Sequence, residues 1–139
     1  MNMRKILIPG FVVLLIGSVL YIFFKPSKMA ILCKAPWCVN SIYYKGRLIQ
    51  PKTLHAIYMV RGDGKRPCLE NISFDKSGDA ELPGINSRVI AGDWQLDSNK
   101  NLQLNVDTLQ YIFQGTYNVT IVDNKLVLKS KTTVIDANR

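Results

Sequence analysis

The chain has 139 residues, of which 47% are hydrophobic and 20% are charged, and its formal net charge at pH 7 is +8. This length suits one domain, and the composition excludes a disordered tail and a collagen-like repeat. Three cysteines are too few for a disulfide-dense scaffold, and a single histidine excludes every site that needs two. Clues to function must therefore come from the order of apolar, polar and charged residues along the chain.

A continuous apolar segment occupies residues 6–24, which contain no charged side chain. A helix of this length would span roughly 28 Å, close to the hydrocarbon core of about 30 Å. We therefore expect a transmembrane signal-anchor helix, with Tyr21, Phe23 and Phe24 in an aromatic belt. A cleaved signal peptide is the alternative, but the chain continues with Lys-Pro-Ser-Lys, which is no small-x-small cleavage site.

The charges beside this segment bear on its orientation. Residues 1–5 include Arg4 and Lys5, and we expect this short tail to stay in the cytoplasm. That orientation predicts a single-pass protein of the bacterial inner membrane with residues 25–139 in the periplasm. The lysines that follow the span would favour the opposite orientation on a simple count of flanking charges; they are Lys25, Lys28 and Lys34.

Residues 25–36 form a basic linker, after which apolar and polar residues alternate. The alternation is clearest in residues 54–60, 88–97, 102–107, 117–122 and 126–129. A period of two is typical of strands with one buried face. Turn residues separate these segments at spacings of about 8–12 residues, which predicts an antiparallel meander closing into a barrel or sandwich. We expect an all-β domain over residues 37–139 with about seven or eight strands.

Several short motifs extend over residues 68–135. They are Ile72-Ser-Phe-Asp-Lys-Ser-Gly78, Gly92-Asp-Trp94-Gln-Leu96, Leu102-Gln-Leu104, Gly115-Thr-Tyr117 and Leu126-Val-Leu128-Lys-Ser130. Together they resemble the small lipocalin-like domains of bacterial envelope proteins, in which a Gly-x-Trp strand precedes hairpins that end in a Leu-x-Leu strand. The resemblance implies an antiparallel barrel and, among functions, a carrier of a small apolar ligand.

The cysteines allow more than one pairing. In an oxidising compartment, a Cys38–Cys68 disulfide would join the first strand to the third and contribute about 3 kcal/mol to stability. A Cys33–Cys38 disulfide is equally allowed by the spacing, and free buried thiols are a further possibility. We expect no metal site, because the three cysteines lack a fourth ligand and His55 lies in a predicted strand.

No catalytic set can be assembled from the remaining polar residues. His55 lies on the predicted wet face of its strand, with no nucleophile and carboxylate suggested around it. Oxygen-bearing side chains alternate from Asp75 to Glu81 as at the start of a calcium loop, but the glycine comes at the fourth position instead of the sixth. This segment is expected to be an acidic hairpin turn, so the sequence predicts neither an enzyme nor a cofactor.

The positive charge is concentrated in the part of the chain that follows the predicted anchor most closely. Residues 25–66 hold nine basic side chains against the single acid Asp63, a balance of +8, whereas residues 67–139 hold seven basic and nine acidic ones, a balance of −2. The predicted basic binding face consists of Lys45, Arg47, Lys52, Arg61, Lys65 and Arg66. It could meet anionic lipid headgroups, at about 1 kcal/mol per cation, or an acidic protein partner, or be a solvated surface. We expect no nucleic-acid partner, because nucleic acid is a poor fit for a domain expected to be exported and the basic half lacks the regular aromatic interleaving of a stacking platform.

These features together predict a membrane-anchored, non-catalytic binding module of the cell envelope. Its expected role is that of an accessory subunit or interaction domain of a membrane assembly, held at the cytoplasmic membrane by its anchor. Two alternatives stay open: a lipocalin-like carrier of a small apolar ligand, and an immunity protein against an envelope-targeted toxin.

Overall fold

A computed structural model describes residues 26–50, 68, 70–84, 89–106 and 112–139. The chain divides into a unit that ends at Ile31 and a unit from Leu32 to Arg139. The described part of the first unit holds most of the short helix α2 (Lys28–Leu32), where the Ala30 N–H donates to the Ser27 Oγ at 3.1 Å and caps the first turn. No helix among the described residues is long and apolar enough to cross a membrane, and the predicted tail and span at residues 1–24 lie outside them.

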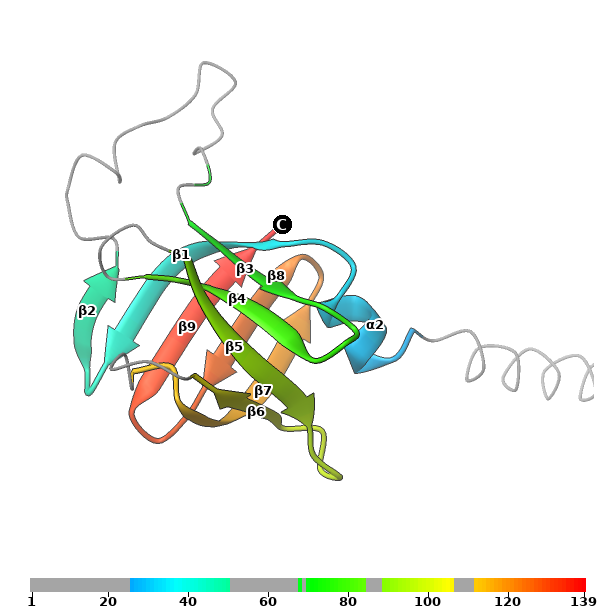
Figure 1. Ribbon diagram of the computed structural model, residues 1–139. Coiled ribbons are helices and arrows are strands. Elements are labelled where there is room, and N and C mark those ends of the chain that lie inside the picture. The colour runs from blue at the N-terminus through cyan, green and yellow to red at the C-terminus, as the bar shows by residue number, and fades with distance from the viewer. Residues whose placement is uncertain (1–25, 51–67, 69, 85–88, 107–111) are drawn as a thin grey trace, which may run out of the picture. The chain divides into compact units, whose positions relative to one another are not determined.

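The second unit is an antiparallel β-barrel (Figure 1). Its strands are β1 (Trp37–Tyr44), β2 (Arg47–Gln50), β3 (Asn71–Phe74), β4 (Asp79–Pro83), β5 (Val89–Leu96), β6 (Leu102–Asn105), β7 (Gly115–Val122), β8 (Lys125–Lys129) and β9 (Thr133–Asn138). Strands β3 to β9 follow one another in chain order, and β1 pairs with both β3 and β9 to close eight strands. The predicted all-β barrel is confirmed, whereas the predicted strand at 54–60, with His55, lies outside the described residues.

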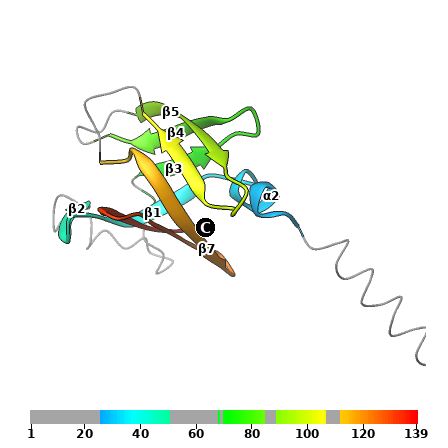
Figure 2. The ribbon, with the colours of Figure 1, turned by 90° about the horizontal axis from the view of Figure 1, so that it is seen from below.

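One more described strand, β2, pairs with β1 but lies outside the closed ring of eight strands. It pairs with the end of β1, through Tyr43↔Leu48 and Tyr44↔Arg47, whereas β3 pairs with the start of β1, through Trp37↔Ile72 and Cys38↔Asn71. Since β9 occupies the other edge of β1, the strands β2 and β3 share one edge. Figure 2 shows β3, β4 and β5 on one side of the unit and β1 and β2 on the other.

The β1–β3 seam is a short strand pairing among the described residues. Besides its two residue pairs, the Val39 N–H donates to the Glu70 carbonyl oxygen at 2.9 Å. A disulfide between Cys38 and Cys68 crosses this seam, with a Cα–Cα distance of 5.4 Å, and Cys33 is a free thiol. Burial raises the pKa of the Cys33 thiol, with a smaller contribution from the negative charge of Asp75. Of the two disulfides that the sequence allows, the structure therefore contains Cys38–Cys68, which links β1 to the residues before β3.

The Gly92-x-Trp94 motif organises the packing of β5. A Cβ at Gly92 would lie 2.9 Å from the backbone oxygen of Asn105, so only glycine lets β6 approach this closely. Trp94 is buried, donates its indole N–H to the Asp75 carbonyl oxygen at 2.8 Å, and packs edge-on against Phe74 with ring centroids 5.3 Å apart. The motif thus ties β5 to the β3–β4 turn as well as to the interior.

The end of the barrel where the chain enters is closed by Trp37. Its fully buried indole donates to the Leu32 carbonyl oxygen at 3.1 Å. The Arg139 guanidinium lies over the Trp37 ring, 3.6 Å from its centroid, and also donates to the Leu32 oxygen at 3.5 Å. Burial lowers the pKa of Arg139. The Leu32 carbonyl oxygen therefore joins the start of the β unit to β1 and to Arg139, the residue after β9.

The opposite end is closed by a buried polar cluster. The Tyr117 hydroxyl donates to the Phe113 carbonyl oxygen at 2.9 Å, and the Thr133 hydroxyl donates to the Ile112 carbonyl oxygen at 2.6 Å. Both side chains are fully buried. Between the two ends, the inward positions of the strands carry large apolar side chains, among them Phe74, Leu82, Leu102, Leu128 and Ile135.

Burial of Tyr117 predicts a loss of stability at alkaline pH. Burial raises the pKa of Tyr117 to about 12, and a tyrosine in the unfolded chain titrates near about 10. The unfolded state therefore loses this proton first, so the stability is full below about pH 10 and falls as the pH rises towards 12. Urea unfolding at about pH 9 and pH 11 should differ by about 1–2 kcal/mol from this group, and Tyr117→Phe should remove that difference. An unchanged pH dependence in Tyr117→Phe, matching the exposed control Tyr43→Phe, would contradict the assignment.

Candidate functional site

A tight hairpin joins β1 to β2 and carries two of the predicted basic residues. Its two-residue turn consists of Lys45, with φ 48°, and Gly46, with φ 76°, and both values lie in the left-handed region. Such a pair matches the twist of the flanking strands and fixes the register in which Tyr44 pairs with Arg47. The Lys45 N–H donates to the Thr132 carbonyl oxygen at 2.7 Å, which ties this hairpin to the β8–β9 turn.

An apolar pair is exposed beside this turn. Tyr43 and Leu48 are cross-strand partners in β1 and β2, and their side chains are 41% and 48% exposed. They face away from the core because the preceding residue, Ile42, is fully buried and successive side chains of a strand alternate. On the other side of Tyr43, its partner in β9 is the half-buried Val134. An aromatic and two aliphatic side chains therefore lie in one row across three strands.

Four cations lie at the same end of the barrel as this row. Lys45 and Arg47 come from the hairpin itself, while Lys129 pairs with Val134 and Lys131 lies in the β8–β9 turn. All four are exposed, and within the described part of the chain none of them has a carboxylate partner. The Lys45 ammonium lies 5.3 Å from the centroid of the Tyr44 ring. We call this set the hairpin surface; it consists of Tyr43, Lys45, Arg47, Leu48, Lys129 and Lys131.

The structure brings together only part of the predicted basic face. Of its six members, Lys45 and Arg47 belong to the hairpin surface. The other four lie outside the described residues; they are Lys52, Arg61, Lys65 and Arg66. Sequence reasoning missed Lys129 and Lys131, because they lie in the half of the chain with a negative balance. Their proximity to Lys45 depends on the pairing of β1 with β9, which composition does not reveal.

The hairpin surface lies at the end of the barrel opposite the point where the β unit begins. The β unit begins at Leu32 beside Trp37, the first residue of β1, whereas Lys45 follows Tyr44, the last residue of β1. A strand of eight residues at about 3.3 Å per residue separates these points. The cations are therefore presented at the end of the barrel remote from Leu32.

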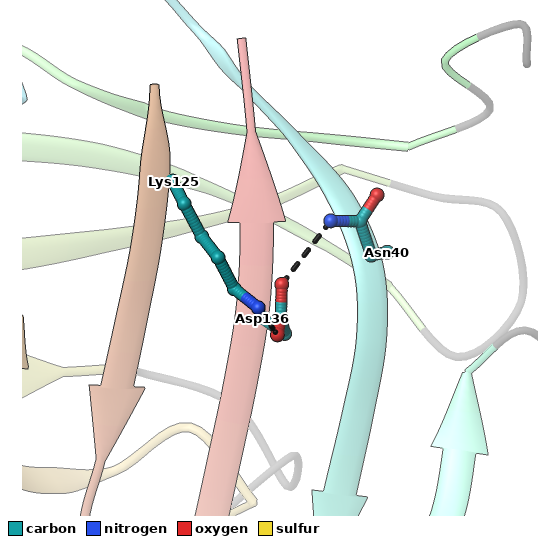
Figure 3. Close-up of polar contacts among 3 residues, drawn as sticks. All are labelled: Asn40, Lys125 and Asp136. Atoms are coloured by element: carbon teal, nitrogen blue, oxygen red, sulfur yellow. Dashed lines mark hydrogen bonds and ion pairs between the residues drawn. The ribbon is translucent and has the colours of Figure 1, made fainter. Parts of the chain in front are cut away.

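A carboxylate on the same side of the barrel is already engaged by other strands. Asp136 of β9 forms an ion pair with Lys125 of β8 at 2.9 Å and accepts a hydrogen bond from the Asn40 amide of β1 at 3.1 Å (Figure 3). Asn40 is the extra residue of a β-bulge, because Val39 pairs with Ala137 and Ser41 with Asp136. Asp136 thus joins three strands, and its charge is shared with Lys125 instead of the hairpin surface.

The acidic segment after β3 is a hydrogen-bonded turn. The Ser77 N–H donates to the Asp75 carboxylate at 2.9 Å, and the Ser77 hydroxyl donates to the Asp79 carboxylate at 2.6 Å. Hydrogen bonds from Ser77 lower the pKa of Asp75. In the part of the chain that the structure describes, no group of three or more His, Cys, Asp or Glu side chains is placed to hold a metal ion.

A second surface, absent from the sequence reasoning, is an open groove on the outer wall of the barrel. It has a volume of about 570 Å³ and lies over β5, β6 and the start of β7. Its lining residues are Asp93, Trp94, Gln95, Gln103, Leu104, Asn105, Gln114, Gly115 and Thr116. We call this the amide groove, since four of its side chains are amides. The sequence shows that the outward positions of β5 and β6 are polar. It does not show the register that brings these side chains together across the sheet.

Comparisons with protein-family models, curated proteins and solved structures found no match for this chain. The resemblance to lipocalin-like domains therefore stays a prediction from its motifs, and the case for a function depends on the geometry of the two surfaces.

Proposed function

We propose that the chain is a membrane-anchored, non-catalytic binding module of the bacterial cell envelope. It acts as an accessory subunit, and its hairpin surface docks on an acidic protein surface of a membrane assembly. The observation that carries this proposal is the exposed Tyr43–Leu48 pair at the same end of the barrel as four cations that have no carboxylate partner within the described residues.

The composition of the hairpin surface is that of a protein contact. Tyr and Arg are enriched among the residues that dominate binding energy at interfaces. Tyr43 and Leu48 supply apolar area at the centre, and Lys45 and Arg47 flank them at the tip of the hairpin. Rim cations of this kind speed association with an acidic partner and make binding depend on salt.

The location of the surface favours a partner over the anchoring membrane. The β unit begins at Leu32, at the end of the barrel that Trp37 closes. Lys45 and Arg47 lie at the other end, beyond the full length of β1. A surface that served to lie on the headgroups beside the anchor would be expected near the residues that follow the anchor in the chain. The predicted contact with anionic lipid is therefore the alternative outcome in the test.

The interior of the barrel supports a binding module over a carrier. Large buried side chains occupy the inward positions, and the ends are closed by Trp37 with Arg139 and by Tyr117 with Thr133. Barrels of eight strands have an interior that side chains just fill. An apolar ligand would have to displace these side chains, so we rank the carrier below the binding module.

Site-directed photocrosslinking in intact cells tests the proposal. A photoreactive amino acid in place of Leu48 in the full chain should yield one dominant protein adduct, identified by mass spectrometry. With that partner purified, the double variant Lys45→Glu/Arg47→Glu should bind at least about tenfold more weakly, since reversing rim charges replaces attraction by repulsion. The wild-type affinity should fall as salt is raised, and the salt dependence should diminish in the variant.

The matched control reverses two positive charges at a different place on the barrel. Lys76→Glu/Lys100→Glu alters the turns at the opposite end of the barrel and should leave the affinity within about twofold of wild type. Adducts with phospholipid instead of protein, or equal affinities of the two double variants, would overturn the proposal. The identity of the partner then separates a subunit from an immunity protein, since the latter would capture a toxin.

A further inference from the structure

The outward face of β5, β6 and β7 presents an ordered array of neutral polar groups. Strand pairing aligns Gln95 with Gln103 and Gln103 with Thr116, so these three form one row across the wall. Asp93 pairs with Asn105, and Gln114 lies beside Asn105 in a second row. With strands about 4.8 Å apart, the two rows present their groups over roughly 10 Å.

Hydrogen bonds between the amides fix their orientation. The Gln95 amide donates to the Gln103 oxygen at 2.8 Å, and the Gln114 amide donates to the Asn105 oxygen at 2.9 Å. The Gln114 oxygen in turn accepts from the Val106 N–H at 3.4 Å. Each amide has two donor hydrogens and an oxygen with two lone pairs, so these bonds leave the Gln103 and Asn105 N–H groups and the Gln95 oxygen for a ligand.

The floor of the groove is formed by buried residues of two paired strands. Trp94 and Leu104 line it from below, with 4% and 3% of their surfaces exposed, and they pair with each other across β5 and β6. The close approach of these two strands depends on Gly92. Polar groups held on a packed sheet lose little freedom on binding, which is the condition for a preorganised site.

The charge of the groove limits what it can bind. Among the described residues that line it, Asp93 is the one charged residue, and none is a lysine or an arginine. An anionic ligand such as a phosphate or sulfated sugar would therefore meet no counter-charge. The strands β5, β6 and β7 are each paired on both sides, so a peptide cannot add a strand here by main-chain hydrogen bonds.

We infer that the amide groove binds a neutral glycan chain. Sugar hydroxyls both donate and accept hydrogen bonds, and the array offers them amide N–H groups, amide oxygens, the Thr116 hydroxyl and the Asp93 carboxylate. A volume of about 570 Å³ falls within the range of about 300–1,000 Å³ for ligand sites and accommodates a short oligosaccharide in an open groove. This inference concerns a different wall of the barrel and does not depend on the proposed docking partner.

Glycan binding is tested with the full chain in phosphatidylcholine nanodiscs, because detergents with sugar headgroups would compete for the groove. The probes are immobilised neutral oligosaccharides, namely chitotetraose, maltotetraose and cellotetraose. We expect saturable binding of at least one of them, unchanged by added salt. The variant Gln95→Met/Gln103→Met keeps side-chain length but removes the amides, and it should weaken that binding at least about tenfold.

Two controls make the outcome decisive. The hairpin variant Lys45→Glu/Arg47→Glu should bind the oligosaccharide as wild type does, whatever becomes of its partner binding. Single variants Gln95→Glu and Gln103→Glu keep the fold because both side chains lie on the outer face of the wall, and they should also weaken binding, because a carboxylate has no N–H donors. Failure of all three probes, undiminished binding in the Met variant, or binding of a lysine-rich peptide but of no glycan would overturn the inference.

Discussion

Replacement of both Cys38 and Cys68 by serine should lower the free energy of unfolding by about 3–4 kcal/mol. The disulfide joins residues separated by 30 positions, and the chain-entropy argument gives a stabilisation of this size for such a loop. The effect is expected to be near the upper part of that range, because within the described residues the β1–β3 seam that it crosses has two residue pairs. Urea unfolding of the full chain in a mild detergent, followed by far-ultraviolet circular dichroism, measures it.

The matched control for this prediction is Cys33→Ser. Cys33 is a free thiol, so its replacement should change the free energy of unfolding by less than about 0.5 kcal/mol. Reduction of the wild-type protein should reproduce the double variant, and should have no effect on the double variant itself. Equal stability of the wild type and the double variant would show that the seam is held by its backbone pairing alone.

Trp94→Ala should be strongly destabilising, at about 3–5 kcal/mol. The indole is almost fully buried, packs on Phe74, and holds the β3–β4 turn through its bond to the Asp75 oxygen. Removing it creates a cavity and takes away one of the two donors to the Asp75 carbonyl oxygen, which also accepts from the Gly78 N–H at 3.1 Å. Trp94→Phe should cost less, because it keeps the ring contact and loses only the indole hydrogen bond and part of the volume.

Thermal and urea unfolding distinguish these contributions. The control Val122→Ala changes a side chain that is 60% exposed at the end of β7, and it should alter stability by no more than about 0.5 kcal/mol. A loss below about 1 kcal/mol in Trp94→Ala would contradict the packing role assigned to the Gly92-x-Trp94 motif. Loss of glycan binding in Trp94→Ala would follow from either role, so the amide variants and not this one test the groove.

Local alternation predicted the strands best where pairs of neighbouring strands are joined by short turns. Leu102 and Leu104 in β6, and Leu126 and Leu128 in β8, are buried as their spacing indicates. Strand β2 gives no such signal, because it is short, exposed and defined by the turn at Lys45-Gly46. The strand depends on a left-handed backbone conformation at Lys45, and alternation of apolar and polar residues does not predict such a conformation.

The candidate sites were less accessible to prediction than the strands. A count of charges pointed to Lys45 and Arg47, but Lys129 and Lys131 join them only through the pairing of strands distant in sequence. In the same way, Gln95 and Gln103 each occupy an ordinary outward position of a strand. Their hydrogen bond, and the groove beside it, follow from a register that has to be known before the two residues can be related.

Closure of the barrel through β1 and β9 also fixes the order of events during folding. Residues 38–44 find their partners in residues 133–138, so the first barrel strand keeps one unpaired edge until the last has been synthesised. Contacts between segments this far apart slow folding, typically to milliseconds or longer in barrels and sandwiches. The hairpins from β3 to β9 can assemble stepwise as they emerge. The second edge of β1, in contrast, is paired only when β9 has formed. A chain that stalls before Thr133 therefore presents an open sheet edge, the form most exposed to proteolysis and to pairing with other chains.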